Sequence, residues 1–157
     1  MKLAELIIGG EPYEVVIFPE NAPIATERFE ALVKSNIFNG WKVKFVVPDR
    51  LIKFEPFKDT VHFTERPMTR PDHSAPKLRQ GVLAFVGVNK EMVSDRLMFV
   101  LNDEDAATYD GICSPIGCLT VDHQKKVSQV DEGMIISKIS IKEVEKEEIL
   151  SRIPSFI

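Results

Sequence analysis

The sequence predicts a mainly β domain in which short strands form a barrel and helices cover its ends. Short apolar stretches, several with a two-residue alternation, recur along the whole chain. Glycines and prolines separate these stretches and supply turn chemistry. The 157 residues are 44% apolar, which is enough for one domain with one sizeable core. Helical patterns are confined to residues 21–36, to residues 130–138 and to a short charged turn in the tail.

The first part of the chain predicts a hairpin followed by a helix. Residues 3–8 and 13–18 are the two strands, because the Gly-Gly-Glu-Pro between them suits a hairpin turn. Asn21 is the expected N-cap of the helix, and Pro23 falls in the first turn, where its missing N–H costs nothing. Asn36 can end the helix in a left-handed conformation. Helical spacing gives one buried face, made of Ala25, Phe29, Leu32 and Val33.

Six further strands are expected downstream, where apolar residues either alternate or run continuously. They are residues 41–47, 50–54, 81–88, 96–101, 113–121 and 139–144. The segment 55–79 holds four prolines and no periodicity, so we expect a long loop of the kind that often carries function. Residues 102–111 are rich in acids and predict a turn region.

Composition limits the classes of function. The net charge of −4 argues against a general nucleic-acid binder, because phosphate contacts need clustered Lys and Arg. No apolar run reaches the roughly 18–20 residues of a membrane span. The start of the chain lacks the apolar stretch of a secretion signal, so we expect no membrane contact and a cytoplasmic location. Cys113 and Cys118 predict two buried thiols rather than a redox pair.

No cofactor and no metal is expected. His62, His73 and His123 are scattered and lack the short spacing of metal ligands. The sequence contains no glycine-rich phosphate loop, and none of its serines lies in a nucleophile-elbow context. No feature of the sequence indicates an oligomeric state.

Five sequence motifs occur in an order and at a spacing that are typical of one known protein family. The longest is VVIFPENAPIATERFEALVKSNIFNGWKVKFVVPD, and the others are GVLAFVG, RLMFVL, YDGICSPIG and DEGM. From the first hairpin to about Ile141 the chain resembles the cyclophilin family of peptidyl-prolyl cis-trans isomerases. The resemblance implies a closed eight-stranded antiparallel barrel capped at each end by a helix. It also implies a single domain over 1–157, with 144–157 as a C-terminal extension, and a proline-containing peptide or protein as partner.

The resemblance implies rotation about the X–Pro bond as the activity, against a barrier of ~18–20 kcal/mol. In the family, an apolar pocket holds the proline while one arginine donates a hydrogen bond to the imide nitrogen, which draws its lone pair out of conjugation. In this sequence Phe45 aligns with that arginine. The pocket phenylalanine aligns with Arg50, the pocket methionine with Leu51 and a glutamine with Lys53.

The residues that line the far side of the family's groove also differ in this sequence, in size, charge or hydrogen-bonding capacity. The replacements are Val86 and Gly87 for Ala-Asn, Arg96 for glutamine, Met98 for phenylalanine, Thr108 and Tyr109 for Trp-Leu, and Cys113 for histidine. The predicted peptide-binding groove therefore consists of Phe45, Arg50, Leu51, Lys53, Val86, Arg96, Met98, Tyr109 and Cys113.

These replacements predict weak or absent catalysis, because the loss of one transition-state donor commonly costs about 10²–10³ in rate. Three hypotheses follow. The first is a peptide- or protein-binding module of altered specificity. The second is an active isomerase in which Arg50 or Arg96 supplies the guanidinium from a different strand. The third is a structural or assembly protein whose groove is filled by its own side chains.

Single groove residues also allow two interpretations each. Phe45 either packs on the barrel or forms an apolar floor for a peptide, and Met98 either fills the core or contacts a ligand. The basic residues are either solvated charges or a basic groove that takes an acidic or C-terminal peptide through carboxylate contacts. Tyr109 either closes a turn or stacks against the peptide.

Overall fold

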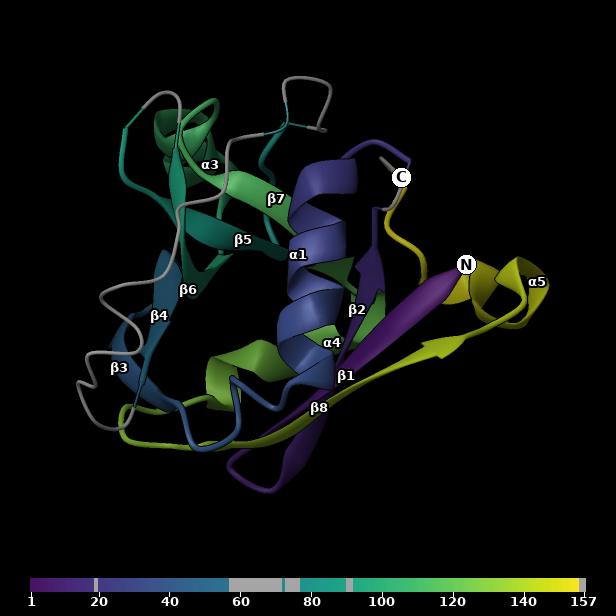
Figure 1. Cartoon of the computed structure of the whole chain (residues 1–157), viewed down its shortest axis with the longest axis horizontal. Helices are drawn as coiled ribbons and strands as arrows, with labels where there is room; N and C mark the ends of the chain where they lie inside the picture. Colours follow the sequence, from purple (N-terminus) through teal and green to yellow (C-terminus); the bar gives the residue numbers. More distant parts are fainter. Residues whose placement is uncertain (19, 57–71, 73–76, 90–91, 156–157) are drawn as a thin grey trace.

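The computed structural model describes residues 1–18, 20–56, 72, 77–89 and 92–155 (Figure 1). Within them, eight antiparallel strands form one curved sheet around an apolar core. The strand order is β3-β4-β6-β5-β7-β2-β1-β8. The strands are β1 (Lys2–Ile8), β2 (Glu11–Ile17), β3 (Lys42–Val47), β4 (Leu51–Glu55), β5 (Val82–Gly87), β6 (Val93–Val100), β7 (Ser114–Leu119) and β8 (Ile136–Glu143).

The sheet is open, so the prediction of a closed barrel is wrong. β3 and β8 are its two edges, and no ladder joins them within the described residues. Among the described residues, backbone hydrogen bonds connect the two edges where Gly40–Val43 lies beside Gly133–Ile136. There Val43 N–H donates to the Met134 carbonyl at 2.8 Å, and Gly40 N–H donates to the Ile136 carbonyl at the same distance. Gly133 has φ +86°, a value that favours glycine, and it lies in the turn before β8.

The predicted first hairpin is confirmed, but its loop is shorter than expected, because Glu11 and Pro12 belong to β2. β1 and β2 pair so that Ile8 lies opposite Glu11, which leaves a two-residue loop. Both loop residues have positive φ, +59° at Gly9 and +81° at Gly10. This is the conformation of a type I′ turn, and glycine adopts it without steric cost.

The helix α1 (Pro23–Lys34) packs against β7 and β8 (Figure 1). Its buried face consists of the four predicted apolar residues and Thr26. Phe29 stacks on Phe38 with 5.7 Å between ring centroids, and Phe38 stacks on Trp41 at 4.9 Å. Asn36 has φ +57°, so the helix is followed by the predicted left-handed residue.

The prediction of two helices is wrong in number, although α1 and the charged helical turn in the tail lie where the sequence places them. The described residues contain four α-helices: α1, α3 (Asp103–Tyr109), α4 (Val121–Lys126) and α5 (Lys146–Ile149). The helix expected over 130–138 is absent, because that stretch turns at Gly133 and then enters β8. The acidic stretch 102–111 forms α3 because the Asn102 side chain caps it, accepting from Asp105 N–H at 2.7 Å. None of the described helices combines the length and apolarity needed to cross a bilayer.

A remote carboxylate caps α1, and the expected cap at Asn21 is wrong. The N-cap residue is Ala22, whose side chain cannot accept a hydrogen bond. The Asp72 carboxylate takes that place, accepting from Ile24 N–H at 2.9 Å and from Ala25 N–H at 2.8 Å. Its negative charge also faces the positive end of the helix dipole. Asp72 therefore ties the predicted 55–79 loop to α1, although residues 57–71 and 73–76 lie outside the described residues.

The C-terminal segment packs on its own sheet. Ile149 of α5 forms a second apolar cluster with Leu3 and Val16, and Ile153 packs against it. Arg152 adds ion pairs to Glu14 of β2 and to Asp122 of α4. The described part of the predicted 144–157 extension is thus bound to the β1–β2 surface.

Both cysteines are free and buried, as the sequence predicts. Burial raises the pKa of the Cys118 thiol to about 12. This thiol is therefore protonated at neutral pH and is a poor nucleophile.

Asp72→Ala should lower the free energy of unfolding by about 1 kcal/mol, because two N–H groups of α1 lose their acceptor. Urea unfolding measures this change. Glu27→Ala, which removes an exposed acid from the middle of the same helix, is the control and should have a smaller effect. Equal stability of Asp72→Ala and the unmodified protein would rule out the cap.

Candidate functional site

Three neighbouring strands bring the centre of the predicted groove together. Phe45 of β3 lies opposite Lys53 of β4, and Lys53 lies opposite Met98 of β6. Residues that face each other across a sheet share a side of it. The positions that align with the family's arginine, glutamine and phenylalanine therefore form one continuous row, which we call the central row.

A cation lies over the ring at the first position of the central row. The Lys53 ammonium is 5.6 Å from the centroid of the Phe45 ring, within the range of a cation–π contact. Phe45 is partly buried against the core. The phenyl ring itself has no hydrogen-bond donor, and the ammonium above it comes from β4 rather than β3.

The other end of the central row is buried. Met98 has no exposed surface, and Cys113 is only 4% exposed. Their sulfur atoms are 3.8 Å apart, and Gly87 N–H donates to the Cys113 sulfur at 3.4 Å. Burial raises the pKa of the Cys113 thiol, so it remains protonated. Leu51 is also buried, so the aligned proline pocket offers little surface through these three side chains.

Gly87 explains one departure from the family pattern. A Cβ atom at this position would lie 2.4 Å from the Ile112 carbonyl oxygen, which is closer than real contacts allow. The asparagine that the family places here could not fit without a shift of the backbone. Ile112 lies in the turn between α3 and β7, so the close approach of this turn to β5 requires the glycine.

The first candidate guanidinium is held by α3. Arg50 makes a bidentate ion pair with Asp105, with both N–O distances at 2.9 Å. Asp105 also accepts from the Asn102 side chain at 2.9 Å. The hydrogen bond from Arg50 is the main cause that holds the pKa of Asp105 below its usual range. This pair joins the β3–β4 turn to α3.

The second candidate guanidinium lies beside a carboxylate of β4. Arg96 is 3.7 Å from Glu55. The same carboxylate is 2.9 Å from the Lys44 ammonium and 3.9 Å from that of Lys42. Neither Arg50 nor Arg96 is therefore free of a carboxylate partner.

The remaining groove residues have structural contacts. Val86 is partly buried, and its carbonyl accepts from the Ser94 hydroxyl at 2.9 Å. Tyr109 ends α3, and its carbonyl accepts from the N–H groups of Ile112 and Cys113 at 3.0 Å. The Tyr109 backbone thus closes a turn, one of the two roles expected for this residue.

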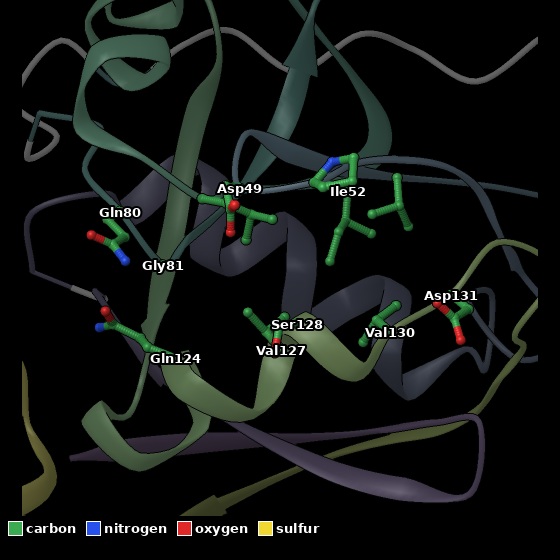
Figure 2. Close-up of a pocket in the computed structure, with 12 residues that line it drawn as sticks. Asp49, Ile52, Gln80, Gly81, Gln124, Val127, Ser128, Val130 and Asp131 are labelled. Atoms are coloured by element: carbon green, nitrogen blue, oxygen red, sulfur yellow. The ribbon is translucent and has the colours of Figure 1, made fainter.

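A separate cavity of about 190 Å³ lies on the other face of the β3–β4 ribbon (Figure 2). Val46 and Ile52 contribute to it, and they alternate with Phe45 and Lys53 along their strands. Apolar and polar groups both line the cavity, so it suits an apolar group with a hydrogen-bonding or cationic end. None of the nine predicted groove residues lines this cavity. The lining residues are Val46, Pro48, Asp49, Ile52, Gln80, Gly81, Leu101, Gln124, Val127, Ser128, Val130 and Asp131.

The cavity could not be predicted from the sequence, because it depends on α4 and on the turn Val127–Gln129 that follows. The periodicity placed a helix at 130–138 instead, so nothing in the prediction covered this part of the sheet. The alternation of Val46 and Ile52 with the groove residues is the only signal, and it indicates a face without indicating a hollow.

The described residues contain no group of three His, Cys, Asp or Glu side chains arranged to hold a metal ion. His123 has a structural role, because its Nδ1 accepts from Glu14 N–H at 2.7 Å and its ring packs edge-on against Tyr13. His62 and His73 lie outside the described residues.

This arrangement of eight antiparallel strands and α1 is a cyclophilin-like fold. It is similar to a cyclophilin-type peptidyl-prolyl cis-trans isomerase from Cryptosporidium parvum, with a TM-score of 0.71 and 12% identity, over 92% of this chain and 99% of that one. The same type of isomerase from Cryptosporidium parvum, solved in the presence of the dipeptide Ala-Pro, gives a TM-score of 0.69 and 13% identity over 90% and 99%. No protein-family model and no curated relative matches the sequence. The predicted resemblance in fold is confirmed.

Asp105→Asn should lower stability to urea at neutral pH and have no effect in acid. The folded-state pKa of Asp105 is depressed, so its contribution is present above the ordinary value of 3.8 and is lost as the pH falls through the folded value. The urea midpoint measured from pH 7 down to pH 2 tests this. Arg50→Gln should show the same pH dependence, and the double variant should lose no more than either single one. A difference that stays constant with pH would contradict the pairing.

Proposed function

We propose that this chain is a binding module for proline-containing peptides or proteins, built on a cyclophilin-like fold and with weak or absent isomerase activity. One observation carries the proposal: Phe45 stands at the head of the central row, where the family aligns its arginine. A phenyl ring can pack against a peptide, but it cannot donate to the imide nitrogen.

The ion pairs of Arg50 and Arg96 support the low activity. To act in catalysis, Arg50 would have to leave Asp105, and Arg96 would have to act beside the negative charge of Glu55, 3.7 Å away. The bidentate Arg50 pair resists this most, since two parallel charge-assisted hydrogen bonds fix its geometry. An active isomerase with a relocated arginine is therefore the result that would overturn this part of the proposal.

Proline is the proposed ligand chemistry because a similar structure was solved in the presence of Ala-Pro. Phe45 of the central row is partly buried and keeps some exposed surface, and so do Val86 and Tyr109 at two other predicted groove positions. The proposal includes a cytoplasmic location, which suits two free thiols, because reducing compartments keep cysteines unpaired.

A second candidate function is a structural or assembly role with the groove filled by its own side chains. The burial of Met98 and its sulfur contact with Cys113 favour it. These side chains occupy the positions that the family uses to enclose a proline. A partner would then bind elsewhere on the surface.

Exchange spectroscopy on a short Ala-Pro peptide tests the catalytic part of the proposal. We expect no acceleration of cis-trans exchange at protein concentrations up to that of the peptide. Lowering the rotational barrier requires a hydrogen-bond donor to the imide nitrogen, and Phe45 has none. Acceleration that disappears in Arg50→Ala or Arg96→Ala would establish the relocated arginine instead.

Chemical-shift titration with the same peptide tests the binding part. Backbone signals of Phe45, Lys53 and Tyr109 should move together and saturate, while those of the distant α5 should not. Phe45→Ala should weaken the binding, because it removes the exposed edge of the ring. If no groove signal moves with any proline peptide, the binding module is excluded and the assembly role is favoured.

A further inference from the structure

A group of charges lies one step along the sheet from the central row. Lys42 and Glu55 are direct partners across β3 and β4, and Arg96 precedes Met98 by two residues on β6. Together with Lys44, which lies at a register shift of β3, they form what we call the charged row. A ligand that crosses the Phe45 ring along the strand direction would meet this row next.

The charged row carries an excess of positive charge. Three cations surround one carboxylate, which leaves a formal charge of +2. Lys53 adds a further cation in the adjacent central row. The whole chain, in contrast, has a net charge of −4. This surface is therefore attractive to anions although the protein as a whole repels them.

Lys44 and Arg96 still have exposed N–H donors that could bind a further anion. The side chains of Lys44 and Arg96 are 52% and 40% exposed, whereas that of Glu55 is only 17% exposed. A guanidinium has five N–H donors in a planar fork, and the 3.7 Å separation of Arg96 from Glu55 is longer than a hydrogen bond. The fork of Arg96 is thus able to receive a second carboxylate from the solvent side.

We infer that the charged row is a subsite for a carboxylate of the bound peptide, and that Glu55 is its internal counter-ion. Glu55 holds Lys44 and Arg96 in place, and its own charge opposes the incoming carboxylate. The inference rests on the proposed peptide-binding function. Carboxylates come from an Asp or Glu side chain or from a peptide C-terminus, and the two sources share this chemistry.

Three peptides of one length separate the sources. They are acetylated Ala-Ala-Pro-Ala with an amidated end, the same peptide with a free C-terminus, and acetylated Glu-Ala-Pro-Ala with an amidated end. Shift titrations at low and at physiological ionic strength give their affinities. At least one carboxylate peptide should bind roughly two- to fivefold more tightly than the neutral one, as one exposed ion pair allows. Added salt should reduce the difference.

Variants then test the roles of the individual charges. Glu55→Gln keeps a carbonyl oxygen for Lys44 and removes the opposing charge, so the carboxylate peptide should bind roughly two- to fivefold more tightly again and the neutral peptide should be unaffected. Arg96→Gln and Lys44→Gln should remove the preference. Glu11→Gln is the matched control, because it makes the same charge change at another lysine-paired glutamate, on β2.

The outcomes distinguish this inference from the proposed function. Equal affinities for all three peptides, or a preference that survives in the Arg96→Gln, Lys44→Gln double variant, would refute the subsite while leaving peptide binding intact. If none of the peptides binds the unmodified protein or Glu55→Gln, both the subsite and the proposed function fail.

Discussion

The backbone pairing of β3 with β4 and of β4 with β6 sets which side chains share the candidate groove. The register opposes Phe45 to Lys53 and Lys53 to Met98, and it places the charged row one step further on. Side chains alternate between the two faces of a strand, so a slip of one residue would exchange this surface for Val46 and Ile52, which line the cavity. The outer groove and the inner cavity thus depend on the same hydrogen bonds.

On this surface, charge has replaced the neutral groups that the family resemblance implies. The aligned arginine is a phenylalanine, and cations stand instead at positions that align with a glutamine or with the pocket phenylalanine. Carboxylates from α3 and β4 form ion pairs with two of these cations, Arg50 and Arg96. Charged groups on a binding surface contribute mainly to the choice of ligand by its charge.

The scaffold is independent of these changes. Aromatic stacking beneath α1, the Asp72 cap and the apolar contacts of the C-terminal segment all lie away from the central row. At 12–13% identity the fold still matches cyclophilin-type isomerases over 90–92% of the chain. Burial and strand register preserve the architecture, because many apolar residues fill the same interior, whereas a site requires particular atoms at particular places.

The existence of the eight strands, the first hairpin turn and the buried face of α1 could be predicted from the sequence, because these features depend on local periodicity and on glycine conformation. The aligned motifs also assign Phe45, Lys53 and Met98 to one predicted groove, and the strand register then places the three in the central row. Three features could not be predicted in this way: the open sheet, the cap of α1 by Asp72 rather than Asn21, and the carboxylate partners of Arg50 and Arg96. Each of these depends on residues brought together from distant parts of the chain, such as Asp72 with Ile24 or Arg50 with Asp105. Periodicity within a single segment contains no information about such contacts.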